Sequence, residues 1–267
     1  MLTINNRNVV KGLFPNNEVD YIPVSEVLPW STTAPHGGRS FTFKLVFESN
    51  IDLFNLMVMS KAVDDKYKNS YKRLFINFFP YEQMDREMDS HLFSLKYVAR
   101  LINDCNFSEV IILDPHSNVL PALLNNVEVS YPPLVAIACG AYDLFFYPDN
   151  GAAKKYSEVY DNPYRFGNKR RNLDTGEIVS YDVIASREDI KDKKILIVDD
   201  LVMGGRTFTE AAKALKEMGA AQVDLHVTHV MPQAKDFWNS KGNGWIDNLY
   251  TADTLDVVEG FKLRQKP

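Results

Sequence analysis

The stretch Lys193–Ala220, KKILIVDDLVMGGRTFTEAAKALKEMGA, determines the fold that the sequence predicts. Its apolar run, residues 195–198, is typical of a strand that is buried on both faces of a parallel sheet. Asp199 and Asp200 follow at the carboxyl end of this strand, the end at which open α/β sheets bind ligands. We therefore expect a ligand site beside these two carboxylates.

Two glycines, Gly204 and Gly205, connect the strand to a helix predicted over residues 207–218, and Gly219 stands where helices commonly end. Glycine allows tight turns and lets backbone amides approach a ligand closely. A glycine loop before a helix N-terminus binds phosphate, and the neighbouring carboxylates suit sugar hydroxyls or Mg²⁺. The residues alone leave a second interpretation open, an ordinary strand–helix unit with acidic loop residues.

The composition is that of an ordinary soluble globular protein, with 267 residues, 45% hydrophobic and 24% charged. No apolar run reaches the ~18 residues of a membrane span, and the N-terminus lacks the apolar core of a signal peptide. Two cysteines indicate no disulfide framework, so we expect a cytoplasmic protein. The net charge of −5 argues against a broad nucleic-acid-binding surface. Basic residues instead gather in residues 154–171, where six stand against two acidic ones, and such a local cluster suits a small polyanion.

The run IVDDLVMGGRTF resembles the phosphoribosyl-diphosphate (PRPP) loop of type I phosphoribosyltransferases. Further segments resemble the ribose-phosphate pyrophosphokinases, also called PRPP synthetases, over roughly residues 13–255. They are LFPNNE, PYEQMDR, DPH, PDNGA, NKRR and the TH of residues 228–229. This resemblance implies an α/β fold with two phosphoribosyltransferase-like halves, residues 1–130 and 131–267, each a mainly parallel sheet flanked by helices.

The resemblance also implies roles for residues of the first half. Phe14, Glu18, Gln83, Asp85 and Arg86 match segments that bind ATP, the first two across a subunit boundary in a homodimer or larger homo-oligomer. Gln83 stands where the family has an arginine, which removes a bidentate phosphate donor.

Metal ligands and catalytic residues are implied in the same way. Asp114, His116 and Asp149 match segments that hold Mg²⁺ or the nucleotide. Lys169 and Arg171, together with His116, are the expected catalytic residues, since cations over a transferring phosphoryl group stabilise the charge of the transition state.

The ribose 5-phosphate and PRPP site is expected to consist of seven residues: Asp149, Asp199, Asp200, Gly204, Gly205, Arg206 and Thr207. The sequence departs from the family here, because Met203 replaces an acid and Arg206 replaces a glycine. We expect Arg206 to contact the 5-phosphate; an arginine that points into solvent is the alternative.

The activity that the resemblance implies is ribose-phosphate diphosphokinase, which transfers the diphosphoryl group of ATP to the 1-hydroxyl of ribose 5-phosphate. One alternative is a phosphoribosyltransferase that consumes PRPP. The other is a catalytically silent regulatory subunit, which the changes at Gln83 and Met203 favour. The expected partners are ATP and ribose 5-phosphate, with no nucleic acid and no membrane.

Overall fold

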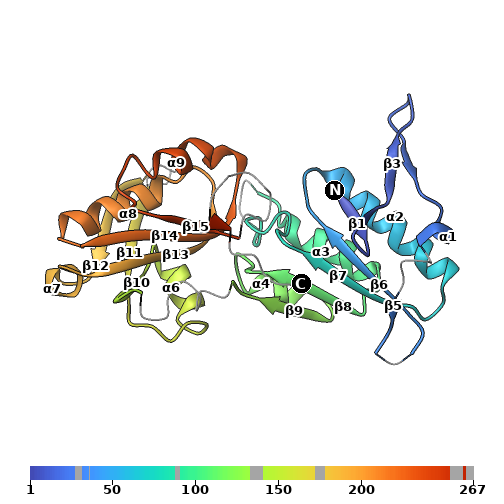
Figure 1. Cartoon of the computed structure of the whole chain (residues 1–267), viewed down its shortest axis with the longest axis horizontal. Helices are drawn as coiled ribbons and strands as arrows, with labels where there is room; N and C mark the ends of the chain where they lie inside the picture. The colour runs from blue at the N-terminus through green and yellow to red at the C-terminus, as the bar shows by residue number, and fades with distance from the viewer. Residues whose placement is uncertain are drawn as a thin grey trace. The chain divides into compact units, whose positions relative to one another are not determined.

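The computed structural model describes residues 1–27, 32–35, 37–87, 91–132, 141–171, 178–252 and 261–262. The chain forms two compact units, Met1–Ser130 and Tyr131–Pro267, and each contains its own sheet (Figure 1). Both are α/β units with mainly parallel strands flanked by helices, which confirms the predicted fold class. In the part of the chain that the structure describes, no helix is long and apolar enough to cross a membrane.

The first unit has a sheet in the order β2-β1-β6-β7-β8-β9, with β5 beside β6. Strands β6 to β9 are parallel, whereas β1, β2 and β5 extend the sheet with antiparallel pairs. A separate hairpin of β3 and β4 projects from this unit (Figure 1). The elements are β1 (Leu2–Ile4), β2 (Arg7–Asn8), β3 (Val10–Leu13), β4 (Val19–Tyr21), α1 (Val24–Val27), β5 (Thr32–Thr33), β6 (Arg39–Leu45), α2 (Asn50–Lys66), β7 (Tyr71–Ile76), α3 (Ser94–Asp104), β8 (Glu109–Leu113), α4 (Val119–Leu123) and β9 (Val127–Ser130).

A lysine lies in the interior of the first unit. Lys72 of β7 is only 1% exposed, and its Nζ donates to Asp64 Oδ2 at 2.6 Å, Ser60 Oγ at 2.8 Å and Cys105 O at 2.6 Å. Burial lowers the pKa of this amine, and Asp64 offsets part of the effect. The three acceptors satisfy the ammonium group, so the lysine joins α2, β7 and the end of α3.

The second unit has a sheet in the order β12-β11-β10-β13-β14-β15-β16, in which only β12 is antiparallel to its neighbour among the described strands. Its carboxyl edge is therefore shared by β10, β13 and β14. The elements are β10 (Leu144–Tyr147), α6 (Asn150–Tyr156), β11 (Tyr164–Arg171), β12 (Ile178–Ile184), α7 (Arg187–Ile190), β13 (Lys194–Val202), α8 (Arg206–Glu217), β14 (Gln222–Val230), η2 (Pro232–Ala234), α9 (Lys235–Ser240), β15 (Leu249–Thr251) and β16 (Phe261–Lys262).

Helices cover both faces of this second sheet (Figure 1). On one face α8 packs Phe208, Ala211 and Leu215 against β13 and β14, together with α9. On the other face α6 packs Ala153 and Tyr156 against β10 and β13. The central strands are buried on both sides, which explains their continuous apolar runs.

The decisive stretch folds nearly as predicted, with one correction. Strand β13 continues to Val202 instead of ending at residue 198, so Asp199 and Asp200 lie within the last residues of the strand. Pairing with β14 carries the strand past the apolar run, because backbone hydrogen bonds do not depend on side-chain polarity. Gly219 has φ of 98° just after α8, as predicted for a helix-ending glycine.

Candidate functional site

Asp149 lies between β10 and α6 and is the N-cap of that helix. Its Oδ1 accepts from the backbone N–H of Ala152 at 3.0 Å, and its Oδ2 accepts from Lys169 Nζ at 2.5 Å. Burial alone would raise the pKa of this carboxyl, but the hydrogen bonds from Lys169 and the helix amides lower the pKa below its ordinary value. Asp149 is therefore an ionised carboxylate that is already paired with a cation.

The acids Asp199 and Asp200 lie at the same carboxyl edge of the sheet. Asp200 is 6% exposed, Asp199 is half-buried, and the backbone N–H of Asp200 donates to Asp199 Oδ1 at 3.0 Å. Burial, followed by the neighbouring Asp200 and Asp149 carboxylates, raises the pKa of Asp199 well above its usual range, whereas Lys155 acts in the opposite direction. The structure thus brings three predicted carboxylates within electrostatic reach of one another, with more acid than nearby base.

The predicted cations Lys169 and Arg171 lie on β11, a strand that the sequence analysis did not predict. Lys169 approaches Asp149 from this strand, and its antiparallel partner on β12 is Tyr181. The side chain of Arg171 lies outside the described part of the chain, as do residues 172–177. The structure therefore joins Lys169 to the acidic cluster and leaves the role of Arg171 a prediction.

Gly205 has a specific reason to be glycine. It is the N-cap of α8 with φ of 75°, and a Cβ at this position would lie 2.0 Å from Cγ of Phe237. Gly204 has open space where its Cβ would be. Arg206 is exposed and Thr207 half-buried in the first turn of α8, where backbone N–H groups have no partner within the helix. Such a turn can bind an anion, and the phosphate site expected here stays a prediction.

Two loops meet at the carboxyl edge of the sheet in the first unit. The loop after β7 contains Glu82 and Asp85, and the loop after β8 contains His116 and Ser117. The His116 N–H donates to Glu82 Oε2 at 2.6 Å, and Ser117 Oγ donates to Asp85 Oδ2 at 2.9 Å. The predicted ATP and metal segments of this unit are therefore held together, partly by Glu82, which the sequence analysis missed.

The other predicted residues of these loops have varied settings. Asp114 is 1% exposed with φ of 46°, and its N–H donates to Ser130 O at 2.8 Å. Gln83, Arg86 and the side chain of His116 are exposed, and Arg86 Nε lies 3.2 Å from Asp85 Oδ1. The predicted residues of these loops therefore include a buried acid and several exposed polar side chains.

Phe14 and Glu18 lie at the tip of the β3–β4 hairpin rather than beside these loops. Phe14 is 50% exposed, its N–H donates to Glu18 O at 2.8 Å, and the Glu18 N–H donates to Asn16 Oδ1 at 3.2 Å. These contacts hold the turn itself and leave the phenyl ring exposed.

The predicted magnesium ligands divide between the two units, with Asp114 and His116 in the first and Asp149 in the second. Among the residues that the structure describes, no three His, Cys, Asp or Glu side chains are grouped as a metal site. The metal site remains a prediction.

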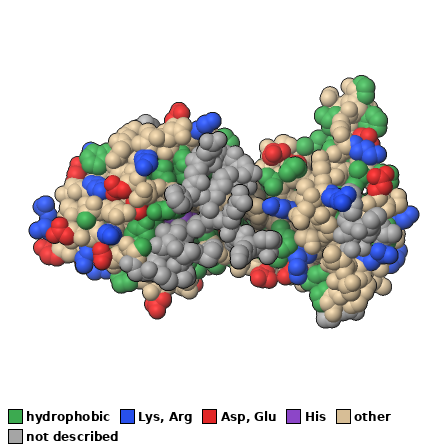
Figure 2. Space-filling view, viewed as in Figure 1, with side chains coloured by type: hydrophobic (Ala, Val, Ile, Leu, Met, Phe, Trp, Pro, Cys, Tyr) green, Lys and Arg blue, Asp and Glu red, His purple; other side chains and the backbone are tan. Residues whose placement is uncertain are grey.

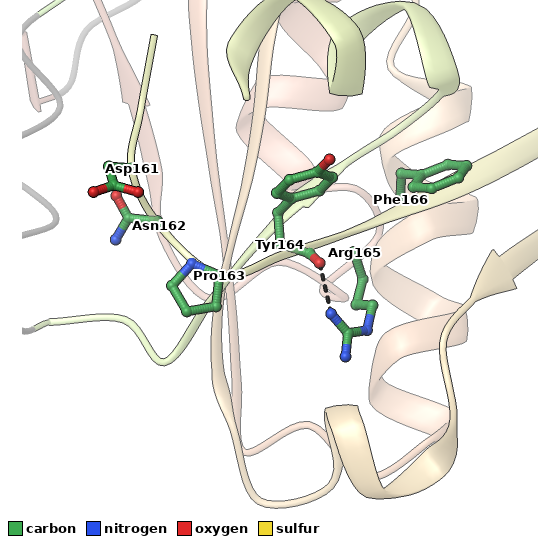
Figure 3. A pocket seen from close by; sticks show the side chains of 6 residues that line it. All are labelled: Asp161, Asn162, Pro163, Tyr164, Arg165 and Phe166. Atoms are coloured by element: carbon green, nitrogen blue, oxygen red, sulfur yellow. Dashed lines mark hydrogen bonds between the residues drawn. The ribbon is translucent and has the colours of Figure 1, made fainter. Parts of the chain in front are cut away.

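A surface pocket of about 590 Å³ lies elsewhere in the second unit (Figure 3). It is lined by six consecutive residues, Asp161–Phe166, at the start of β11, and none of them is a predicted site residue. Arg165 is held there by Tyr164 O at 2.8 Å and by Asp189 at 2.7 Å. We place the candidate site at the acidic cluster, because the predicted site residues lie at the opposite, carboxyl end of these strands.

Charges of both signs are interspersed over the second unit on the face that Figure 2 shows. No broad surface of one charge is seen among the described residues on that face, so a small anion bound at a local point is a better match there than an extended polyanion.

Comparison with known proteins places this geometry in a protein class. The phosphoribosyl transferase domain family matches residues 151–254. The ribose-phosphate pyrophosphokinase of Campylobacter jejuni is 24% identical over 227 residues, which cover 79% of this chain and 70% of the relative. That of Clostridium perfringens is 27% identical over 228 residues, covering 79% and 69%. The crystal structure of phosphoribosylpyrophosphate synthetase from Mycobacterium smegmatis has the same fold, with a TM-score of 0.64 and 19% identity over 86% of this chain and 81% of that one.

The fold and the acidic cluster beside a glycine loop define an α/β transferase with a phosphoribosyltransferase domain in its second unit. The similarity of the wider chain is more particular. Over most of its length the chain is similar to ribose-phosphate pyrophosphokinases, which are transferases.

Proposed function

We propose that this protein transfers the diphosphoryl group of ATP to the 1-hydroxyl of ribose 5-phosphate, giving PRPP and AMP. The observation that carries the proposal is the cluster of Asp149, Lys169, Asp199 and Asp200 at one sheet edge, followed directly by the turn at Gly205. Carboxylates that repel one another are poised to accept hydroxyl protons or a cation, and the turn offers backbone amides to a phosphate.

In this site the 5-phosphate binds the N-terminus of α8 through backbone N–H groups, Thr207 and Arg206. Asp199 and Asp200 accept hydrogen bonds from the ribose hydroxyls. Lys169 leaves Asp149 and meets the charge that develops on the transferred phosphates, where a preorganised cation contributes most. Asp149 is an expected ligand of Mg²⁺, which when bound would neutralise charge on the nucleotide phosphates.

The ATP part of the site is assigned to the first unit, at the loops that Asp85 and Glu82 join to Ser117 and His116. The exposed ring of Phe14 fits a site completed by a second copy of the chain. We therefore propose a homodimer or a larger homo-oligomer. Light scattering that shows an active monomer would contradict this part of the proposal.

The test of the activity is ³¹P NMR of the purified protein with ATP, Mg²⁺ and ribose 5-phosphate. We expect the signals of AMP and PRPP to grow together, with no release of free phosphate. Lys169→Ala is the matched inactive control, because its loss removes the cation and leaves the carboxylates.

A second candidate activity is phosphoribosyl transfer from PRPP. The observation that favours it is the domain match at residues 151–254. It predicts pyrophosphate release from PRPP and a nitrogen base, which the same NMR measurement detects. Binding of ATP and ribose 5-phosphate without any turnover would instead identify a regulatory subunit.

A further inference from the structure

The side chain of Tyr181 on β12 reaches across the neighbouring strand β11 to the end of β10. Its hydroxyl donates to Pro148 O at 3.0 Å, at the end of β10 and directly before Asp149. Pro148 lies beyond the last residue of β10, and the tyrosine gives its carbonyl oxygen a donor.

The path of this side chain depends on Gly167 of β11. A Cβ on Gly167 would lie 2.0 Å from the Tyr181 hydroxyl and 3.0 Å from Pro148 O. Gly167 is buried, so the tyrosine occupies the space that any larger residue would fill. The absence of a side chain at this position is therefore a condition of the contact with Pro148.

Tyr181 also lies directly opposite Lys169 in the antiparallel pair of β11 and β12. Opposed residues in such a pair have side chains on the same face, about 4.5–5.5 Å apart at Cβ. The tyrosine thus contacts the backbone before Asp149 and flanks the lysine that bonds to Asp149. It is therefore placed next to the Lys169–Asp149 ion pair by its register and by its bond to Pro148 O.

We propose that Tyr181 is a positioning residue of the reaction, which fixes the Pro148–Asp149 turn and so places Lys169 where it can move from Asp149 to the transferred phosphates. This inference rests on the proposed function, since it assigns Lys169 to the transition state. Small displacements of a catalytic group have large effects on rate, because the reacting atoms must be aligned.

The first experiment compares two Tyr→Phe variants. Tyr181→Phe keeps the ring and removes the hydroxyl, and we expect kcat to fall about tenfold while the KM for ATP changes by less than about twofold. Tyr160→Phe is the matched control, because the Tyr160 hydroxyl also donates to a proline carbonyl, Pro132 O, at 3.0 Å. Equal kcat values for the two variants would overturn the inference.

A double-mutant cycle separates positioning from general stability. If Tyr181 acts through Lys169, then Tyr181→Phe has less than about a twofold effect on kcat in a Lys169→Ala background. Two effects that multiply would show that the tyrosine acts independently of the lysine. Gly167→Ala tests the same contact from the other side, since the new methyl group must displace the hydroxyl.

Hydrogen exchange gives a readout that needs no turnover. We expect the amides of residues 148–153 to exchange several-fold faster in Tyr181→Phe than in Tyr160→Phe or the wild type. If the wild-type protein made no PRPP, the proposed function would be contradicted. Hydrogen exchange would then still show whether the contact between Tyr181 and Pro148 holds the turn. Unchanged exchange in Tyr181→Phe would contradict the positioning role whether or not PRPP is made.

Discussion

Nζ of Lys169 lies 2.5 Å from Oδ2 of Asp149, so the expected catalytic cation is bound to a carboxylate. The pair links β11 to the N-terminus of α6. A phosphate that arrives at the site must compete with Asp149 for the lysine, and it competes better in the transition state if charge then develops on the oxygens that face the lysine.

Lys169→Ala should therefore lower kcat by about 10²–10³ and change the KM for ribose 5-phosphate much less, as is typical for loss of a transition-state donor. Arg171→Ala should act in the same direction. Lys154→Ala is the control, because this exposed lysine of α6 has the same charge in the same unit. Steady-state kinetics decide the matter: a rise in KM with unchanged kcat would mean that Lys169 binds only ground-state phosphates.

Asp199→Asn should abolish turnover without lowering the melting temperature. The pKa of Asp199 is raised by burial and by Asp200 and Asp149, so its ionised form is unfavourable in the folded protein at pH 7. The amide removes this repulsion, and the gain in melting temperature should shrink as the pH falls and Asp199 becomes protonated.

Asp189→Asn is the matched control for this variant, because Arg165 and Ser186 lower the pKa of Asp189 to about 2. Its ionised form stabilises the folded state above the ordinary pKa, and this effect is lost as the pH falls toward 2. Differential scanning fluorimetry at pH 7 should show a lower melting temperature for Asp189→Asn alone. A fall in melting temperature for Asp199→Asn that accounts for its lost activity would contradict a ligand role.

Gly205→Ala should destabilise the protein by about 1–3 kcal/mol, since the new Cβ meets the ring of Phe237 and the positive φ disfavours any side chain. Gly204→Ala, one residue earlier, has open space around its Cβ and should unfold at nearly the wild-type urea concentration. Urea denaturation followed by circular dichroism measures both. Equal midpoints for the two variants would show that α9 moves to accommodate the methyl group.

His226 should make the protein sensitive to mild acid. It is 1% exposed, neither ring nitrogen has a hydrogen-bond partner among the atoms of the structure, and burial followed by His229 lowers its pKa to about 3. The unfolded chain, with a pKa near 6.5, binds a proton that the folded protein excludes. The contribution of His226 to the free energy of unfolding is therefore complete above pH 6.5. It is lost progressively toward pH 3, by about 1.4 kcal/mol per pH unit.

His226→Leu should flatten this dependence, so the free energy of unfolding should fall by about 2 kcal/mol less than in the wild type between pH 7 and pH 5. His91→Ala, at an exposed histidine, controls for the loss of a titrating group. Parallel curves for His226→Leu and the wild type would show that His226 is protonated in the folded state.

The sequence predicts most of the fold because its signals are local. The apolar run at residues 195–198 and the helical spacing after Gly205 each lie within one element, and the structure confirms them as a strand and a helix. Strands β11 and β12 were missed, since the pairing that defines them lies between segments and β11 is mostly polar. The strands β1 and β2 were missed because they are only three and two residues long.

In the candidate site too, local signals were predicted and contacts between distant segments were not. Asp149, Asp199 and Asp200 follow buried strands, and that position in the sequence is enough to bring them to one edge. Tyr181 and Phe237 could not be predicted, because their contacts with Pro148 and Gly205 depend on cross-strand register and on the packing of α9. No local pattern in the sequence distinguishes these aromatic residues from others in the core.

The buried Lys72 of the first unit has a consequence for how this sequence can diverge. Replacing Lys72 alone leaves Asp64 without its cation, and replacing Asp64 alone leaves an ammonium group in the interior with one anionic partner fewer. Either single change is strongly destabilising, whereas replacing both residues with apolar ones can be tolerated. Positions 64 and 72 should therefore vary together across homologues, and an alignment of close relatives should show this pair as one of the strongest covarying contacts between α2 and β7.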